Sequence, residues 1–121
     1  MNTRIKAFRH AFSGLKDVFQ NEIHFKIHIS ITLLIIVLSI LLKLSTIEWS
    51  IILMSIVSVL SLEIINTAIE IMCNYVQPQQ HPTIKRIKDL SAAAVLTTVV
   101  GVIIIGLIIF IPKIILYVTS F

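Results

Sequence analysis

Three polar side chains interrupt an otherwise apolar stretch of the chain, and their types and spacing suit acid–base chemistry. They are Glu63, Asn66 and Glu70, at positions i, i+3 and i+7. Because a helix turns by about 100° per residue, the three side chains fall within roughly 60° of one another on one helix face. An ionisable residue inside a membrane span costs roughly 2.5–3.5 kcal/mol on insertion scales, so such residues indicate a function. A carboxylate inside a membrane span, near the level of the lipid hydroxyl groups, can accept a proton from a hydroxyl group.

The same residues have a structural alternative, which is that they join helices through hydrogen bonds. Asn66 alone would fit that role well. Two carboxylates and a carboxamide on one face fit it poorly, because one carboxylate suffices for such a contact and an unpaired buried carboxylate is costly. We therefore favour a functional role for the set and keep the interhelical contact as the alternative.

A second group of polar residues lies immediately before the last apolar stretch. It includes Lys88 and Asp89, followed by the small residues 91–94, which allow another helix backbone to approach closely. Taken singly, Lys88 is explained as a topology signal and Asp89 as a first-turn acid favoured by the helix dipole. Glu22, taken singly, is a solvated surface acid.

Taken together, these residues place most of the carboxylates on one side of the expected membrane. Four of the six acids belong to the set, namely Glu22, Glu63, Glu70 and Asp89. Mg²⁺ usually takes one or two carboxylates together with substrate phosphates, and cations such as Lys88 offset phosphate charge. These groups meet the minimum needs of phosphoryl transfer, in which catalysis is mostly positioning and charge stabilisation. The sequence contains neither a G-x-x-x-x-G-K-[ST] loop nor an H-R-D motif, so a nucleotide must be held differently.

The composition indicates which kind of scaffold must position these residues. Of 121 residues, 57% are hydrophobic and 13% are charged, and the mean hydropathy is +1.01. Soluble domains are roughly 45–50% apolar and about 25% charged, so a soluble globule and a disordered chain are both excluded. The single cysteine excludes an internal disulfide framework and a cysteine-based zinc site. We expect one all-α membrane domain over residues 1–121.

Three stretches are long and apolar enough to cross a bilayer, whose core needs roughly 20 residues of helix. They cover about residues 27–44, 49–68 and 90–111, and we expect Pro112 to stop the last one. In residues 3–24, apolar side chains recur at spacings of three and four, and basic side chains lie away from them. This pattern is typical of an amphipathic helix that lies in the membrane interface. The segment is not a signal peptide, because its basic region is too long and no small-residue cleavage site follows.

The distribution of basic residues predicts the orientation. Eight of the ten Lys and Arg residues lie in the N-terminal segment or in the connection 74–89, and the other two are Lys43 and Lys113. The N-terminus and the 74–89 connection should therefore be cytoplasmic, and the C-terminus should lie outside. The net charge of +4 is thus a topology signal, and we expect no nucleic-acid partner.

Two motifs resemble the signatures of the prokaryotic diacylglycerol kinase family. EIINTAIE at residues 63–70 is similar to E-x-x-N-[ST]-A-I-E, and KDLSAAAV at residues 88–95 is similar to K-D-x-x-[AS]-A-A-V. Residues 11–22 resemble the family's N-terminal amphipathic helix with its N-E pair. Order, spacing and the three-span layout agree over about residues 4–115.

The resemblance implies a homotrimeric inner-membrane kinase that transfers the γ-phosphoryl group of Mg·ATP to a lipid hydroxyl, with sites shared between subunits. Under this resemblance, Glu63 matches the general base, and Asn66 matches an amide that helps to order the site. Glu22 and Glu70 match the carboxylates that hold Mg²⁺. The positions that match nucleotide-contacting ones are Glu22, Glu70, Lys88 and Asp89.

Three positions bear on the lipid and nucleotide sites. Phe12 stands where the family commonly has tryptophan, which should affect lipid fit more than chemistry. Gln79 stands where the family often has an acid, so we assign it no metal role. FKIH at residues 25–28 resembles the undecaprenol kinases more than the diacylglycerol branch, which tends to have an acid near His28. The acceptor is therefore undecaprenol or diacylglycerol, with a slight preference for the polyprenol; alternatively, His28 is only an interface-facing histidine hydrogen-bonded to a neighbour.

Two other classes of protein are the rivals. One is a small oligomeric transporter that uses Glu63 as an ion or proton site. It leaves Glu22 and the Lys88–Asp89 pair without a role, and the sequence shows none of the repeats or broken helices typical of transporters. The other is a structural helper subunit, which leaves the whole polar face unexplained. ATP hydrolysis or phosphoryl transfer in detergent separates the kinase from both.

Overall fold

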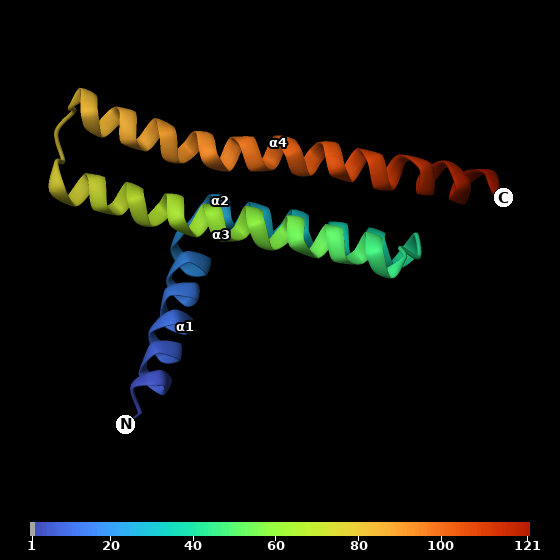
Figure 1. Cartoon of the computed structure of the whole chain (residues 1–121), viewed down its shortest axis with the longest axis horizontal. Helices are drawn as coiled ribbons and strands as arrows, with labels where there is room; N and C mark the ends of the chain where they lie inside the picture. The colour runs from blue at the N-terminus through green and yellow to red at the C-terminus, as the bar shows by residue number, and fades with distance from the viewer. Residues whose placement is uncertain (1) are drawn as a thin grey trace.

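The computed structural model describes residues 2–121, which form four helices joined by short connections. The helices are α1 (Thr3–Asn21), α2 (Ile23–Leu41), α3 (Thr46–Val76) and α4 (Pro82–Thr119). The last three are long and apolar enough to cross a membrane, as the composition predicted. They run side by side, with α3 packed against both neighbours, and α1 leaves this bundle crosswise (Figure 1).

The corner between α1 and α2 is formed by a single residue. Helix α1 ends at Asn21, before the expected residue 24, because Glu22 has an extended backbone with φ −108° and ψ 111°. Beyond this bend, the ring of Phe25 packs edge to face against that of Phe19, with centroids 6.3 Å apart. This aromatic contact joins the end of α1 to the first turn of α2 across the bend.

The turn between α2 and α3 is closed by two capping motifs. Lys43 has a left-handed backbone with φ 54°, and the N–H groups of Lys43 and Leu44 donate to carbonyls in the last turn of α2. This is the Schellman arrangement that ends many helices. Helix α3 then begins with a capping box, in which Ser45 and Glu48 exchange hydrogen bonds. The two motifs set the register between α2 and α3.

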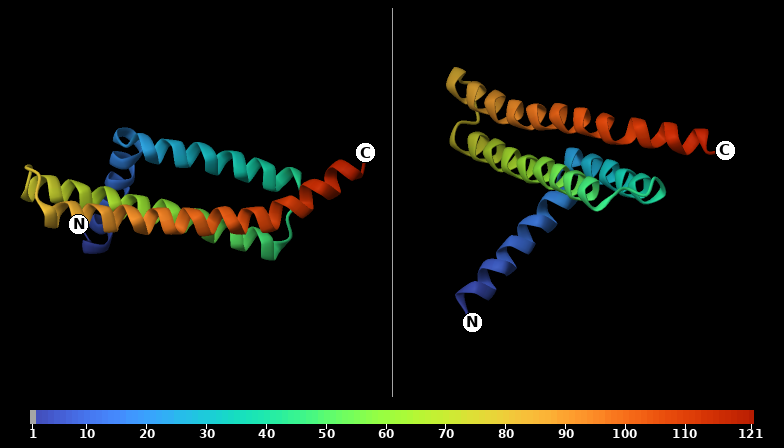
Figure 2. Two further views of the ribbon diagram at one scale, coloured as in Figure 1. Left: turned by 90° about the horizontal axis from the view of Figure 1, so that it is seen from above. Right: turned by 45° about the vertical axis from the view of Figure 1, so that its right-hand side comes forward.

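Helix α4 contradicts the expectation that Pro112 stops the last helix, since it runs through this residue to Thr119. A proline removes one backbone hydrogen bond and kinks a helix, yet membrane helices tolerate it where neighbouring groups hold the segment. Here Lys113 Nζ lies 3.1 Å from Glu48 Oε1 at the start of α3, which ties the residues after the proline to their neighbour. The C-terminal part of α4 turns away from the axis of the rest (Figure 2).

Both long helices exceed the thickness of a bilayer core. At 1.5 Å per residue, the 31 residues of α3 extend about 46 Å and the 38 residues of α4 about 57 Å. A hydrocarbon core is roughly 30 Å thick. Only Gln77–His81 connect the two helices, so most of the predicted 74–89 connection is helical. The charged residues of that region therefore stand on rigid helix ends.

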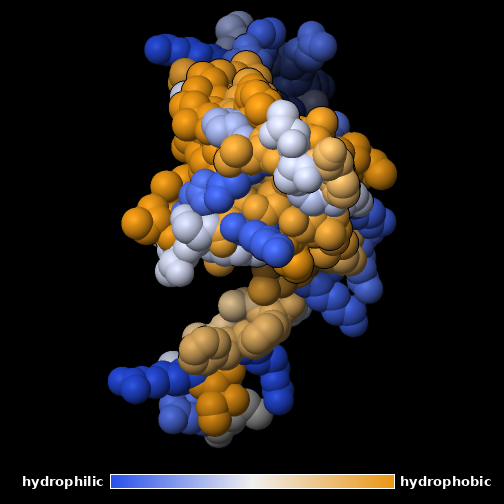
Figure 3. All heavy atoms as spheres, turned by 90° about the vertical axis from the view of Figure 1, so that its right-hand side faces the viewer, coloured by the Kyte–Doolittle hydropathy of each residue, from blue (hydrophilic) through white to orange (hydrophobic). Residues whose placement is uncertain are grey.

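The bundle combines a small core with a large apolar surface. Its buried hydrophobic cluster lies at the end opposite the α3–α4 turn and consists of Leu44, Ile52, Ile109 and Phe110. The chain exposes 9173 Å², whereas a compact soluble monomer of 13.6 kDa exposes roughly 6,600 Å². Hydrophobic side chains dominate the bundle surface seen in Figure 3, whereas α1 shows both kinds. A surface of this size and character must contact lipid or other protein chains.

Candidate active site

Glu63 is buried on α3 beside helix α2. Only 8% of the residue is exposed, and its Oε2 lies 3.6 Å from Nε2 of His28. The carboxylate therefore has a partner that can donate a hydrogen bond or carry a positive charge. This contact offsets part of the cost of placing a carboxylate away from water.

Asn66 links α3 both to α4 and to the next acid along its own face. Ser91 Oγ donates to Asn66 Oδ1 at 2.7 Å, and Asn66 Nδ2 donates to Glu70 Oε1 at 3.4 Å. The bond to Ser91 is the interhelical contact that the structural alternative expects of Asn66. The bond to Glu70 leaves the second carboxylate oxygen of that residue available to a ligand.

The charged residues before the last apolar stretch lie around the α3–α4 turn. The Lys88 ammonium donates to Asn74 Oδ1 across the two helices. Lys85 Nζ lies 2.5 Å from Asp89 Oδ2, one turn further on, and both side chains are exposed. Residues 77–82, together with Lys88 and Asp89, line a hollow of 660 Å³. Its volume is within the range of roughly 300–1,000 Å³ that small-molecule sites occupy.

The side chain of Glu22, unlike those of Glu63 and Glu70, has no hydrogen-bond or ion-pair partner among residues 2–121. Glu22 forms the bend between α1 and α2, is half-buried and makes no capping hydrogen bond to α2. Within residues 2–121, no three His, Cys, Asp or Glu side chains gather closely enough to hold a metal ion. The predicted pair Glu22 and Glu70 would therefore need phosphate oxygens and water as its other metal ligands.

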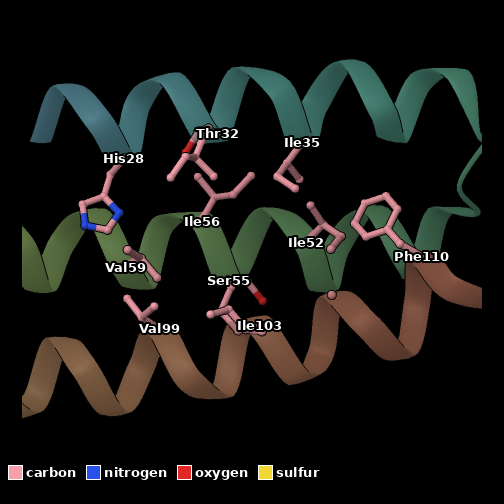
Figure 4. Close-up of a pocket in the computed structure, with 13 residues that line it drawn as sticks. His28, Thr32, Ile35, Ile52, Ser55, Ile56, Val59, Val99, Ile103 and Phe110 are labelled. Carbon is pink, nitrogen blue, oxygen red and sulfur yellow. The ribbon is translucent and has the colours of Figure 1, made fainter. Parts of the chain in front are cut away.

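An apolar cavity of 200 Å³ lies between α2, α3 and α4. Figure 4 shows His28 projecting from α2 toward α3 at one end of this cavity and Phe110 near the other end. The lining is hydrophobic apart from His28, Thr32, Ser55 and a glycine, and the Ser55 hydroxyl donates to a carbonyl of its own helix. Among the residues that line the cavity, His28 alone is ionisable. Its contact with Glu63 is thus bordered by apolar side chains.

Two partners in this site were not predicted from the sequence, namely Asn74 and Ser91. Asn74 follows Glu70 by four residues, so the helical period that groups Glu63, Asn66 and Glu70 also includes it. Ser91 enters the sequence pattern only as the first of a run of small residues. Its hydroxyl meets Asn66 because α3 and α4 pack as a hairpin, which no spacing within one helix indicates.

Comparison with known proteins points to one family. Residues 9–110 match the family model described as prokaryotic diacylglycerol kinase. The chain is 38% identical to the undecaprenol kinase of Bacillus subtilis (strain 168) over 113 residues. The matched region covers 93% of this chain and 92% of that protein. Two diacylglycerol kinases are also similar. That of Synechocystis sp. is 30% identical over 101 residues (83% of this chain, 58% of that protein), and that of Haemophilus influenzae is 29% identical over 91 residues (75% and 77%).

These matches confirm the resemblance that the two motifs indicated. The family match includes residues of all four helices, so it extends well beyond the motifs themselves. The names of the family and of the relatives indicate a lipid kinase, and the three long apolar helices fit a multi-pass membrane protein. Because the family model and a relative at 38% identity both extend over most of the chain, this protein belongs to the prokaryotic diacylglycerol kinase family.

Proposed function

We propose that this protein is an ATP- and Mg²⁺-dependent kinase that phosphorylates the hydroxyl group of a membrane lipid. The observation that carries the proposal is the buried carboxylate of Glu63 on α3, with His28 3.6 Å away and the Asn66–Glu70 pair further along the same helix. At 1.5 Å per residue, Glu70 lies about 10 Å further along the helix axis than Glu63. One helix thus carries a base at lipid depth and a carboxylate nearer to water.

We propose undecaprenol as the acceptor, ahead of diacylglycerol. The undecaprenol kinase of Bacillus subtilis matches almost the full length of both chains, whereas the two diacylglycerol kinases match less of this chain and at lower identity. The FKIH sequence at residues 25–28 supports the same choice. Both lipids present a primary alcohol at the interface, so the same base serves either.

In the proposed reaction, the residues act by holding groups in place and by moving one proton. The oxygen of the lipid hydroxyl attacks the γ-phosphorus of ATP, and ADP leaves. Glu63 accepts the hydroxyl proton in the same step. Asn66 holds Glu70 in position through its amide N–H. Lys88 and Asp89, at the hollow near the α3–α4 turn, contact the nucleotide, and the ammonium of Lys88 offsets charge on the phosphates.

The donor chemistry of the site suits Mg²⁺. Glu70 and Glu22 offer hard carboxylate oxygens, and Mg²⁺ in such sites keeps waters and substrate phosphates as its other ligands. One or two carboxylates therefore suffice, although no three acidic, His or Cys side chains gather within residues 2–121. Bound there, the ion would neutralise negative charge on the β- and γ-phosphates.

We propose a homotrimer with sites shared between subunits, as the resemblance implies. The chain exposes far more surface than a compact monomer of its mass, and the many exposed hydrophobic side chains are free to pack against further copies. Ala92, Ala93 and Ala94 on α4 are exposed, so a neighbouring helix can approach closely there. A neighbouring copy is also the natural source of the groups that Glu22 lacks within its own chain.

We propose that α1 lies in the interface of the inner membrane, with the N-terminus and the α3–α4 turn in the cytoplasm and the C-terminus outside. Five apolar side chains of α1 are each about half exposed or more: Ile5, Phe8, Phe12, Leu15 and Phe19. They follow helical spacing, and basic residues lie away from them. The crosswise direction of α1 suits a helix parallel to the membrane plane (Figure 1).

A phosphoryl-transfer assay on the purified protein tests the proposal. Mixed micelles would contain undecaprenol or diacylglycerol in parallel, with γ-labelled Mg·ATP as the donor. We expect label in lipid, with undecaprenol the faster acceptor. Label in neither lipid would reject the kinase and favour a transporter that uses Glu63 as an ion site.

Replacing Ser91 with alanine tests the link between Asn66 and α4. Because a neutral hydrogen bond contributes about 0.5–1.5 kcal/mol, we expect Ser91→Ala to lower kcat by about 2- to 10-fold. The matched control is Ser58→Ala on α3, whose hydroxyl donates to the Met54 carbonyl of its own helix. Equal rates for the two variants would mean that the Ser91 bond does not order the site.

A further inference from the structure

We infer that His28 is a positioning residue, which holds the Glu63 carboxylate in the orientation that accepts the hydroxyl proton. The inference rests on the proposed function and adds a residue from α2 as a partner of the catalytic base on α3. His28 Nε2 lies 3.6 Å from Glu63 Oε2, and the two side chains are 25% and 10% exposed. Among the described residues, His28 is the one ion-pair partner of this carboxylate.

In this geometry His28 can hold one carboxylate oxygen of Glu63 while the other oxygen accepts the hydroxyl proton. The separation of 3.6 Å is longer than a hydrogen bond, but catalytic hydrogen bonds often tighten only when the substrate is bound. An N–H donated from His28 Nε2 to Oε2 leaves Oε1 as the oxygen that faces the acceptor. Without this contact, the carboxylate would be free to rotate about its terminal torsion, which has a broad energy profile.

The surroundings of His28 strengthen the contact. The ring borders the apolar cavity between the three long helices, where the effective dielectric constant is lower than in water. Its backbone belongs to α2, whose register against α3 is set by the capped turn that contains Lys43 and Ser45. The imidazole is therefore presented to Glu63 by a rigid element rather than by a loop.

The proton balance of the step is simple. The acceptor oxygen bonds to the γ-phosphorus, the bond from this phosphorus to the bridging oxygen of ADP breaks, and ADP leaves. The hydroxyl proton passes to Glu63 Oε1. His28 keeps its own proton on Nε2 throughout, so it orients the base and does not itself react.

Variants that differ in one N–H donor test the inference. His28→Met removes the donor, and since a misplacement of about 1 Å can cost 10²-fold, we expect kcat to fall by about 10- to 100-fold. The KM values for ATP and undecaprenol should stay within about twofold of wild type, because the binding groups are untouched. His28→Gln, which carries an N–H at the end of a side chain of similar reach, should recover most of the rate. His28→Phe is a second variant without a donor, for the case in which His28→Met does not fold.

Two controls separate positioning from a merely structural role. Thr32→Val, one helical turn further along α2 on the same cavity, should leave kcat unchanged. In a Glu63→Asp background the carboxylate no longer reaches the same point, so His28→Met should cost less there than in wild type.

Each result bears on the inference. Wild-type kcat in His28→Met, no recovery in His28→Gln, or an undiminished effect in the Glu63→Asp background would overturn it while the kinase itself stands. If the wild-type protein phosphorylates neither lipid, the proposed function fails, and this inference fails with it.

Discussion

Glu63→Gln should abolish lipid phosphorylation while ATP still binds. Glutamine keeps nearly the same shape but cannot serve as the base, and loss of general-base catalysis lowers a rate by about 10²- to 10⁴-fold. ATP binding should persist, because the change leaves the proposed nucleotide contacts in place, including Lys88 and Asp89 at the α3–α4 turn. The measurement compares initial rates of label transfer from Mg·ATP to undecaprenol and, separately, equilibrium binding of labelled ATP to the same preparation.

The matched control for this variant is Glu48→Gln. It makes the same chemical change on the same helix, but at the opposite end, where Glu48 caps α3 and pairs with Lys113. We expect it to lower the Tm and to leave kcat close to that of wild type. Full transfer activity in Glu63→Gln would reject the base assignment, and loss of both transfer and ATP binding would place Glu63 in nucleotide binding instead.

The helices of this protein are largely predictable from the sequence, because apolar runs of sufficient length have few alternatives in a bilayer. The boundaries are less predictable. The Pro112 expectation is wrong since a proline costs one hydrogen bond, whereas continuing α4 allows Lys113 to reach Glu48 on the neighbouring helix. That pair depends on the packing of α3 against α4. The residues around Pro112 in the sequence therefore do not predict the Lys113–Glu48 pair.

The contacts of the candidate site are likewise of two kinds, those predictable from spacing within one helix and those that depend on packing between helices. The shared face of Asn66 and Glu70 follows from helical spacing alone, and the hydrogen bond between them agrees with it. The partners that come from other helices, His28 and Ser91, depend on the register of two hairpins. The spacing of residues along one helix carries no information about that register. The capped turn at Lys43 and the α3–α4 connection set it, and small shifts in either would pair other residues.

Glu70→Gln should raise the Mg²⁺ concentration that the reaction requires. An Mg²⁺ site has only one or two carboxylates, so each supplies a large part of the negative charge that binds the ion. Loss of the Glu70 carboxylate should therefore lower metal-dependent activity by about 10- to 100-fold at limiting Mg²⁺. Chelation of Mg²⁺ should abolish transfer in wild type, and added Mg²⁺ should restore it. The measurement is the initial rate of lipid phosphorylation at fixed ATP as a function of free Mg²⁺, in wild type and in Glu70→Gln.

The shape of the Mg²⁺ titration decides what Glu70 does. If Glu70 holds the ion, the titration curve of Glu70→Gln shifts to higher Mg²⁺, and part of the lost rate returns at saturation. Glu48→Gln should show an unshifted curve, because that carboxylate lies at the far end of α3. An unshifted curve with a low plateau in Glu70→Gln would instead mean that the residue acts only through its hydrogen bond with Asn66, at 3.4 Å. In that case the metal carboxylates must be sought elsewhere on the cytoplasmic side of the proposed trimer, with Glu22 of a neighbouring copy as the first residue to replace.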